Sequence, residues 1–247
     1  NESPDPLPDT ARDVTGDENA ILQELRGLIF LDNEEAIVED PGDQPGVEIR
    51  FGQPSRVANT QAFRNIAESY LGAPVSQYRL NELIRDLILL YRKYDRPVVD
   101  ISVPVQDVTE GTIQILVREG KIGRACVQGA CYFDNQMLAN QLFLRRGQSI
   151  SEKQLNDEVR WLYRNPFRTI DLELTPGENP GETDVIFNVH DERPVRIYSG
   201  YEDTGNQALG LERTFYGINW YNAFCKDDYI GYQYTASSDF ESLEAHS

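Results

Sequence analysis

The sequence predicts an α+β fold in which two tandem β-α-α-β-β units are followed by a set of antiparallel strands. Three observations support this prediction. Two stretches with apolar residues at helical spacing lie between strand-like runs. The same order of elements then returns about 75 residues further along the chain. In the last part of the chain, residues 194–247, large apolar residues alternate with small or polar ones at every second position.

Residues 1–19 are polar, acidic and rich in proline, which predicts an extended linker. The chain has 23 Lys and Arg against 41 Asp and Glu, a net charge of −18. Thirteen of these acids, but only two of the bases, lie in residues 1–46. The acidic balance argues against nucleic acid or an anionic membrane surface as the main partner. Because the charge is concentrated ahead of the repeat, it indicates a solvated tether rather than a binding face.

The first unit is expected in residues 20–120. In chain order its elements are a strand at Leu25–Leu31, a turn-rich insertion at residues 39–46, a helix from Asn59 or Thr60 to Gly72, a helix from Ser76, and strands at residues 98–105 and 112–119. The helices are predicted from apolar residues that recur on one helical stripe. The second helix stops before Pro97, because the residue that precedes a proline disfavours helix.

The second unit is expected in residues 121–193, because a shift of 75 residues superposes polar positions as well as the apolar stripe. The superposed pairs are Gly72 and Gly147, Ser76 and Ser151, Asn81 and Asn156, and Arg85 and Arg160. In the second copy, Ser151 and Gln154 form the pattern of a capping box. Each copy is expected to place two helices on one face of a three-stranded sheet and to leave a strand edge available.

Residues 194–247 show the alternation of membrane β-barrel strands. In one run Tyr216, Ile218, Trp220 and Phe224 share a strand face, opposite Gly217, Asn219, Tyr221 and Ala223. In the next run Ile230, Tyr232 and Tyr234 lie opposite Gly231, Gln233 and Thr235. A soluble β-meander would give the same alternation. A bacterial barrel needs at least eight strands, and this segment has room for about three, so the barrel interpretation implies a shortened piece of a longer protein.

No catalytic motif stands out, so we predict that the chain is not an enzyme and needs no cofactor. The two histidines, His190 and His246, lie far apart, which argues against a metal site built from His and Cys. We expect His190 to be a surface side chain rather than a catalytic base. The acid pair Asp227 and Asp228 follows a strand in a polar turn and is expected to be solvated.

Two of the three cysteines, Cys126 and Cys131, are close in sequence and flank a Gly-containing turn. They could form a disulfide in an oxidising compartment, or they could remain unpaired. Only their geometry decides between the two.

Four stretches resemble the two-partner secretion transporters of the hemolysin secretion/activation type (TpsB, ShlB-type). They are the segment with Pro104, Gln106, Gly111 and Val117–Gly120, the RNPFR run at 164–168, PGETDV at 180–185, and DERPVRIYSGYEDTG at 191–205. The resemblance implies that residues 20–120 and 121–193 are POTRA (polypeptide-transport-associated) domains. It also implies that residues 194–247 are the first strands of an incomplete transmembrane β-barrel.

The resemblance implies a type V secretion protein of the bacterial outer membrane, with its POTRA domains in the periplasm. Its partners would be an unfolded secreted exoprotein, recognised by its N-terminal secretion domain, and outer-membrane lipid, contacted by the C-terminal strands of the full-length protein. The exoprotein would pass through the barrel and could be activated on export. Two other classes stay open: the POTRA part of an outer-membrane protein-assembly insertase, and a soluble periplasmic scaffold.

The resemblance also implies that the client binds to an exposed edge strand of each domain, where an extended polypeptide can add as a further strand. The client-binding residues are then Val98, Val99, Asp100, Ile101, Ser102 and Val103 in the first domain, and Ile170, Asp171, Leu172, Glu173 and Leu174 in the second. These strands could instead only complete their sheets. Four arginines are candidate exposed clamps on the client or the barrel: Arg145, Arg146, Arg164 and Arg168. They could equally be solvated groups or partners of local carboxylates.

Overall fold

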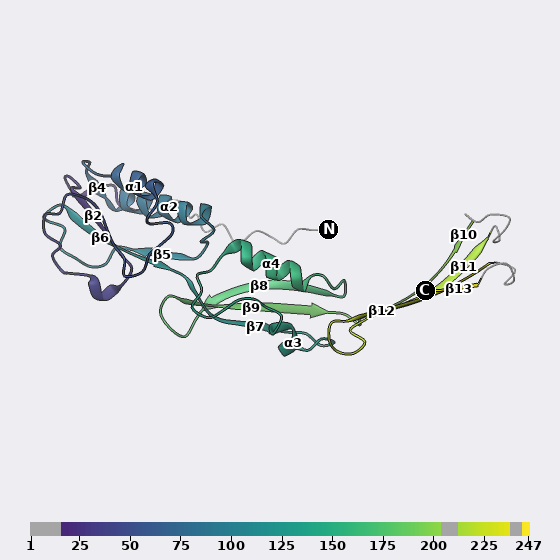
Figure 1. Cartoon of the computed structure of the whole chain (residues 1–247). Coiled ribbons are helices and arrows are strands. Elements are labelled where there is room, and N and C mark those ends of the chain that lie inside the picture. The colour runs from purple at the N-terminus through teal and green to yellow at the C-terminus, as the bar shows by residue number, and fades with distance from the viewer. Residues whose placement is uncertain (1–15, 204–211, 238–243) are drawn as a thin grey trace. The chain divides into compact units, whose positions relative to one another are not determined.

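The computed structural model describes residues 16–203, 212–237 and 244–247. The chain divides into two compact units, which are described separately (Figure 1). The first unit contains the described residues up to Lys121, together with Gly147–Gln154 and Glu178–Glu182. The second contains Ile122–Arg146, Leu155–Gly177 and the described residues from Thr183 onward.

A four-stranded sheet in the order β3-β2-β6-β5 forms the centre of the first unit. Its strands are β2 (Gly27–Leu31), β3 (Gly46–Arg50), β5 (Val99–Ser102) and β6 (Thr112–Glu119). Strand β2 runs parallel to β3 and to β6, whereas β5 runs antiparallel to β6. All five residues of β2 are buried. The two edges of the sheet are therefore β3 and β5.

Helices α1 (Gln61–Glu68) and α2 (Gln77–Lys93) pack against one face of this sheet (Figure 1). The ring of Phe63 on α1 lies 4.8 Å from that of Phe30 on β2 and 6.4 Å from that of Tyr91 on α2, in edge-to-face geometry. Such pairs are favoured over stacked rings because the positive edge of one ring meets the negative face of the other. These three aromatic rings join both helices to the middle of the sheet.

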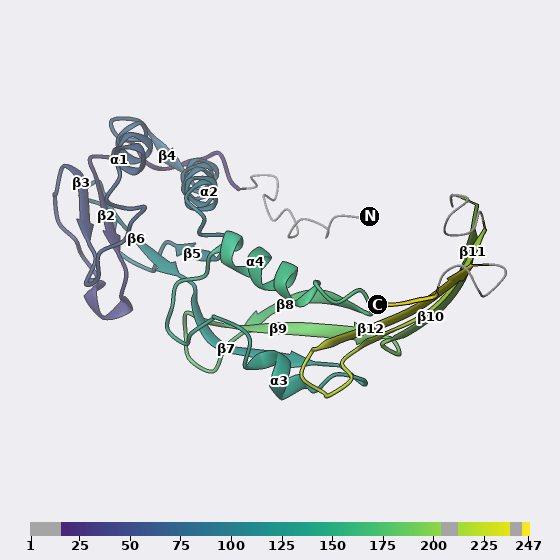
Figure 2. The same cartoon turned by 45° about the vertical axis from the view of Figure 1, so that its right-hand side comes forward.

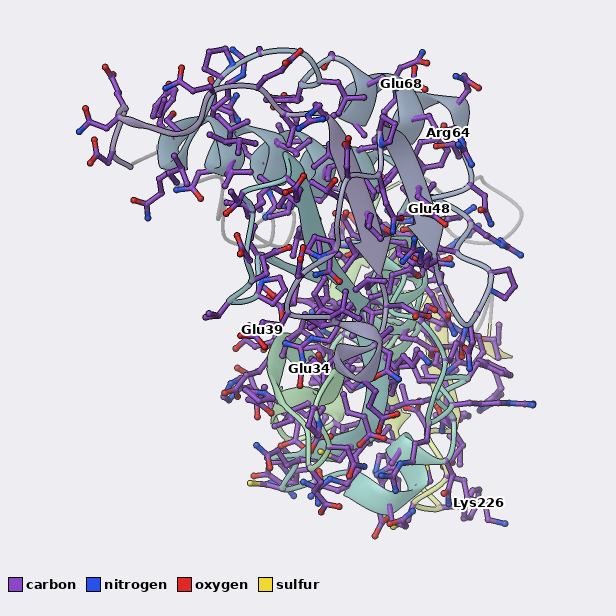
Figure 3. All side chains as sticks on the ribbon, turned by 90° about the vertical axis from the view of Figure 1, so that its left-hand side faces the viewer. Glu34, Glu39, Glu48, Arg64, Glu68 and Lys226 are labelled. Carbon is purple, nitrogen blue, oxygen red and sulfur yellow. The ribbon has the colours of Figure 1, made fainter. Side chains whose placement is uncertain are left out.

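The other face of the sheet is covered by a small apolar cluster, and the N-terminal strand lies outside this sheet. Ile37, which follows the short helix η1 (Glu34–Ala36), packs on the far side of β2 and β6. Strand β1 (Ala20–Leu22) pairs antiparallel with β4 (Val75–Ser76) in a separate two-stranded sheet. Figure 3 labels Glu34, on η1, and Glu39, in the segment that follows it.

Strand β3 is an addition to the predicted three-stranded sheet. Its five residues carry only Val47 and Ile49 as large apolar side chains, between glycine and charged residues, which is a weak strand signal. The strand forms because its backbone pairs with β2 over all five residues. The turn-rich insertion thus supplies an edge strand rather than only a loop.

The second β-α-α-β-β copy has the same order of elements. These are β7 (Lys121–Gln128), α3 (Asn135–Ala139), α4 (Glu152–Leu162), β8 (Arg168–Pro176) and β9 (Glu182–Asp191). The sheet order is β7-β9-β8, so β7 and β8 are its edges. Figures 1 and 2 both show α4 above β8 and β9. Leu155, Val159 and Leu162 of α4 are buried with Phe187 of β9.

The two copies share the local structure that the superposed residues predict. Gly72 and Gly147 both adopt a positive φ, 74° and 79°, which only glycine adopts without strain. Ser76 accepts a hydrogen bond from the amide of Arg79, and Ser151 accepts one from that of Gln154. Of the predicted capping box, the bond from the Gln154 amide to the Ser151 hydroxyl forms. The side-chain oxygen of Gln154 accepts from Gln148 instead of from the Ser151 amide. These matching turns and caps confirm the internal repeat.

A four-stranded antiparallel sheet follows, in the order β10-β11-β12-β13 (Figure 2). Its strands are β10 (Val195–Glu202), β11 (Arg213–Tyr221), β12 (Tyr229–Ser237) and β13 (Glu244–His246). The sequence suggests three strands here, and the short β13 is the fourth. The fold is therefore α+β, with two β-α-α-β-β copies and an antiparallel sheet. Within the described ranges, no helix has the length and apolar character needed to span a membrane.

Candidate functional site

The backbone of β5 has one open side. Val98 accepts a hydrogen bond from the amide of Gly120 at 2.9 Å, so these two residues form a hydrogen-bonded pair of the β5–β6 ladder. Such pairs alternate along an antiparallel ladder, so Asp100 is also paired with β6. The backbone groups of Val99 and Ile101 then point away from β6, toward the open edge.

Strand β8 has the same arrangement over a longer stretch. The amide of Glu192 donates to the carbonyl of Phe167 at 2.8 Å, which fixes the alternation of the unbroken β8–β9 ladder. The amides of Ile170, Leu172 and Leu174 therefore face outward. Pro176 falls in the same outward set, where the missing N–H removes no bond to β9.

The predicted client-binding segments thus lie on edge strands of their sheets. No other described residue hydrogen-bonds to the outward amides of Val99 and Ile101, or to those of Ile170, Leu172 and Leu174. Each strand offers an apolar row and an acidic row to an incoming chain.

The apolar row of each edge lies against the helices and the acidic row faces solvent. Ile101 and Ile170 are buried. Asp100 binds Arg118 at 2.6 Å within the first sheet, whereas in the second sheet Asp171 lies 3.2 Å from the Nε2 atom of His190 and Glu173 accepts from Asn188 at 3.0 Å. An added strand would therefore meet apolar side chains on one face and carboxylates on the other.

Gln106 closes the ladder beyond the end of β5. Its side-chain amide accepts a hydrogen bond from the backbone amide of Gln114 at 2.7 Å and donates to the Gln114 carbonyl at 2.8 Å. Gln114 in turn uses its side chain to bond the backbone of Val38. The Gln106 side chain thus replaces a strand residue, a role that the sequence does not reveal.

The expectation that Arg168 is an exposed clamp is wrong. Its side chain is fully buried and binds both carboxylate oxygens of Asp227, at 3.0 and 2.8 Å. It also donates to the carbonyl of Leu162, and its guanidinium lies 5.1 Å from the ring centre of Phe133. Asn165 donates to the same carboxylate at 3.0 Å. A planar guanidinium and a carboxylate match each other in two parallel hydrogen bonds, which makes this a structural pair.

The same contact corrects the expectation for Asp227, which is an ion-pair partner rather than a solvated turn residue. Asn222 orders the turn that carries it: it accepts from the amide of Asp227 at 3.0 Å and donates to the carbonyl of Tyr132 at 2.9 Å. The arginine and its partner are 59 residues apart in sequence. No local pattern could have linked them.

The other candidate arginines are exposed. Arg164 lies over the ring of Trp161, with 4.3 Å between the guanidinium carbon and the ring centre. Arg145 and Arg146 lie in the loop before α4, on the surface. Arg164, in the loop that leads to Arg168 at the start of β8, thus has a different environment from Arg168.

The two faces of the C-terminal sheet are as the alternation predicts. Cross-strand partners on one face are Val195, Trp220 and Ile230 in one row and Ile197, Ile218 and Tyr232 in the next. This apolar face is exposed, and Ile197 retains 78% of its accessible surface. Phe224 is the exception to the predicted pattern, because it lies in the turn after β11.

The opposite face pairs tyrosine and phenylalanine rings with glycines. A Cβ atom on Gly217 would come within 2.2 Å of the Tyr198 ring, and one on Gly200 would come equally close to Phe215. Gly231 lies beneath Tyr229 in the same way. Gly200 and Gly217 are therefore required by rings from the neighbouring strand, and Gly231 by the ring of Tyr229 two residues earlier on the same strand.

The cysteines are unpaired. Cys126, Cys131 and Cys225 are all free and exposed, so the alternative of a disulfide between Cys126 and Cys131 is not realised. Among the described residues, no cluster of His, Cys, Asp and Glu is arranged to hold a metal ion. His190 is exposed beside Asp171, as expected for a surface side chain.

The comparisons with known proteins agree with this fold. Residues 48–120 match the family model "POTRA domain, ShlB-type". The "Heme/hemopexin transporter protein HuxB" of Haemophilus influenzae (strain 86-028NP) is 22% identical over 156 residues, which cover 62% of this chain and 28% of that protein.

Two solved structures share the fold. CdiB from Escherichia coli matches 97% of this chain and 40% of its own, with a TM-score of 0.69 and 15% identity. CdiB from Acinetobacter baumannii matches 94% of this chain and 41% of its own, with a TM-score of 0.56 and 18% identity. The chain thus spans less than half the length of each of these three proteins.

These findings confirm the resemblance drawn from the sequence. The class that the comparisons indicate is that of proteins with POTRA domains, since residues 48–120 match the model of a ShlB-type POTRA domain. More particularly, the chain is a distant relative of HuxB and shares the fold of the CdiB proteins. The relative is named as a transporter, in keeping with the expectation of a protein that is not an enzyme.

Proposed function

We propose that this chain is the polypeptide-recognition part of an outer-membrane transporter for two-partner secretion. In this proposal the two β-α-α-β-β units lie in the periplasm and capture an unfolded exoprotein. The C-terminal sheet begins the β-barrel through which the exoprotein leaves the cell. The ShlB-type POTRA domain and the relationship to HuxB support the class of transporter.

The open edge of β8 is the observation that carries the proposal. Three outward amides in a row can each donate to an extended client, and main-chain hydrogen bonds make such binding tolerant of sequence. Edge strand β5 offers the same groups over a shorter length. The acidic row of β8, formed by Asp171 and Glu173, favours clients whose exposed side chains are polar or basic, whereas Asp100 of β5 is already paired with Arg118.

The exposed apolar face of β10–β13 supports a location in the outer membrane. Large apolar side chains outward and small or polar ones inward are the pattern that lipid and a polar lumen select. Lipid would then contact Ile197, Ile218 and Tyr232, while the glycine and tyrosine face would line the interior.

Proline at Leu172 tests the mechanism of capture. Leu172→Pro removes an outward N–H but no hydrogen bond to β9, and its ring obstructs an added strand. We expect the affinity for the N-terminal secretion domain of the cognate exoprotein to fall at least about tenfold, because a backbone bond is lost and strand approach is blocked. Pull-down and titration calorimetry on the 247-residue chain measure this.

Two matched variants accompany the test. Leu172→Ala removes the same side chain but keeps the amide, so it should bind the client nearly as the unaltered chain does. Asp171→Pro removes an amide that bonds to β9, so it should lower the melting temperature more than Leu172→Pro does. Equal client affinity of Leu172→Pro and Leu172→Ala would contradict capture at this edge.

A further inference from the structure

A pocket of about 330 Å³ lies in the second unit and is lined in part by the turn between β11 and β12. Trp161 and Arg164 from the end of α4 and the loop after it form one wall. Lys226 from the turn and Tyr229 at the start of β12 form another. Its volume is within the range of small-ligand sites.

Two cations of this pocket have no anionic partner in the part of the chain that the structure describes. The Arg164 guanidinium lies over the Trp161 ring, and stacking leaves the edge of the guanidinium available for hydrogen bonds. Lys226 is exposed and lies at the periphery in Figure 3. Trp161 is itself fixed, because its indole N–H donates to Gln141 at 3.2 Å. The pocket thus offers two cations, one of them on a fixed aromatic ring.

The two carboxylates at the pocket are already occupied. Asp227 is neutralised by Arg168. Asp228 accepts from the backbone amides of Phe224 at 3.0 Å and of Lys226 at 3.3 Å. Burial alone would raise the pKa of Asp228, but these amide hydrogen bonds outweigh it and hold the pKa below its usual value. Asp228 therefore stays ionised, and since Asp227 and Arg168 cancel each other, Arg164 and Lys226 outweigh Asp228 and leave one net positive charge for a ligand.

The pocket adjoins the apolar side chains of the C-terminal sheet. Phe224, in the same turn as Lys226, keeps 70% of its surface exposed, and Tyr229 keeps 57%. Trp220 and Ile230, at the same end of the sheet, are also exposed. Aromatic side chains beside basic ones are typical of the level at which lipid headgroups lie.

We propose that this pocket binds the phosphate group of a phospholipid, with Arg164 and Lys226 as its cationic contacts. Guanidinium and ammonium groups both bind phosphate, the first through its planar fork and the second as a point charge. The acyl chains would follow the apolar face beginning at Phe224. The inference rests on the proposed function, which places that face in the membrane.

The fluorescence of Trp161 reports on the pocket directly. The chain has two tryptophans, so Trp220→Phe leaves Trp161 as the single emitter. We expect a saturable change when this protein is titrated with dihexanoyl phosphatidylglycerol below its micelle concentration. Inorganic phosphate at the same concentration should give a response at least about tenfold weaker, because it lacks the apolar contacts.

The variant that tests the cations is Arg164→Gln with Lys226→Gln. We expect its affinity for the short-chain lipid to fall at least about tenfold, the effect of losing a charge-assisted hydrogen bond. The matched control is Arg56→Gln with Arg64→Gln, which removes the same charge from exposed positions of the first unit. Co-sedimentation of the otherwise unaltered chain with phosphatidylglycerol vesicles gives a second measurement that is independent of Trp161.

Three results would overturn the inference. An equal response to inorganic phosphate would make this a site for free anions. Unchanged lipid affinity of the Arg164 and Lys226 variant would remove the proposed contacts. Loss of exoprotein capture by that variant, with lipid binding intact, would make Arg164 a client clamp instead. If Leu172→Pro leaves capture unchanged while Trp161 still responds to lipid, the edge mechanism fails and the lipid site stands.

Discussion

Glu158 shows how a single residue departs from the repeat. It occupies the position that Leu83 holds in the first copy, 75 residues earlier, and both are buried. The carboxylate is retained because it accepts a hydrogen bond from the amide of Phe143 at 2.9 Å, which ties down the loop after α3. Burial raises the pKa of Glu158 and outweighs the opposite effect of the Phe143 amide. The charged form is therefore a cost to the folded state.

Glu158→Gln should stabilise the protein at neutral pH, because the glutamine carbonyl still accepts from Phe143 and no charge is buried. We expect the melting temperature at pH 7.5 to rise by about 2–4 °C, the shift that about 1 kcal/mol gives in a chain of this size. The folded-state pKa lies above the unfolded one, so the cost exists above the folded pKa and disappears as the pH falls below the unfolded pKa. The difference between the two proteins should thus close by pH 4, as thermal unfolding at both pH values will show. A difference that persists at pH 4 would mean that the effect is not one of charge.

At the level of elements, Gln106 determines how far the first sheet extends. Strand β5 ends at Ser102, which pairs with Leu116 of β6. Strand β6 begins earlier, at Thr112, so its first residues extend beyond the end of β5. The Gln106 side chain satisfies the backbone of Gln114 where β5 no longer does. Without this side chain, the backbone N–H and C=O of Gln114, in a buried strand, would both lose their hydrogen-bond partner.

Gln106→Ala should destabilise the first unit by about 1–3 kcal/mol, the usual cost of a buried polar group left without a partner. The Gln114 amide should then exchange with deuterium faster, whereas the Arg118 amide, still paired with Asp100, should keep its protection. Gln106→Glu separates the two bonds, because a carboxylate can accept from the Gln114 amide but cannot donate to its carbonyl. Protection of the Gln114 amide that survives Gln106→Ala would contradict this role of the Gln106 side chain.

The elements were more predictable than their side-chain partners. Helix caps and turns follow local rules, so Ser76, Ser151, Gly72 and Gly147 predict their own structure. Strand alternation likewise predicts the two faces of β11 and β12. Strand β3 could not be predicted, because pairing with β2 over its full length supplies what its few apolar residues do not.

The candidate site was predictable to the same degree. The edge positions of β5 and β8 agree with the position that the resemblance implies, since sheet order follows from the β-α-α-β-β repeat. Client binding at these edges stays a prediction. The burial of Arg168 could not be predicted, because the RNPFR run resembles an exposed basic loop and Asp227 lies 59 residues away.

For the molecule as a whole, the Arg168–Asp227 pair matters because it joins β8 to the turn between β11 and β12. The start of the open edge and the C-terminal sheet therefore share one buried contact. Removing one partner of a buried pair leaves the other charge without compensation, which typically costs about 3–5 kcal/mol.

Arg168→Met should accordingly lower the free energy of unfolding by about 3 kcal/mol or more. We expect the amide of Asp227, which donates to Asn222, to lose protection against hydrogen exchange as the turn loosens. Arg145→Gln, at an exposed arginine of the same unit, is the control and should leave both measurements unchanged. A partial recovery in the double variant Arg168→Met with Asp227→Leu would show that the unpaired carboxylate causes the loss. Equal loss in single and double variants would contradict this.

On β8, backbone amides point alternately outward and toward β9, and this spacing would set the steps in which a client bound as proposed could move along the strand. Outward amides recur at every second residue, about 6.8 Å apart along an extended strand. A client that shifts by one residue turns its apolar face to solvent, whereas a shift by two restores both the hydrogen bonds and the faces. Bound polypeptide would therefore travel along this edge in two-residue increments between equivalent minima.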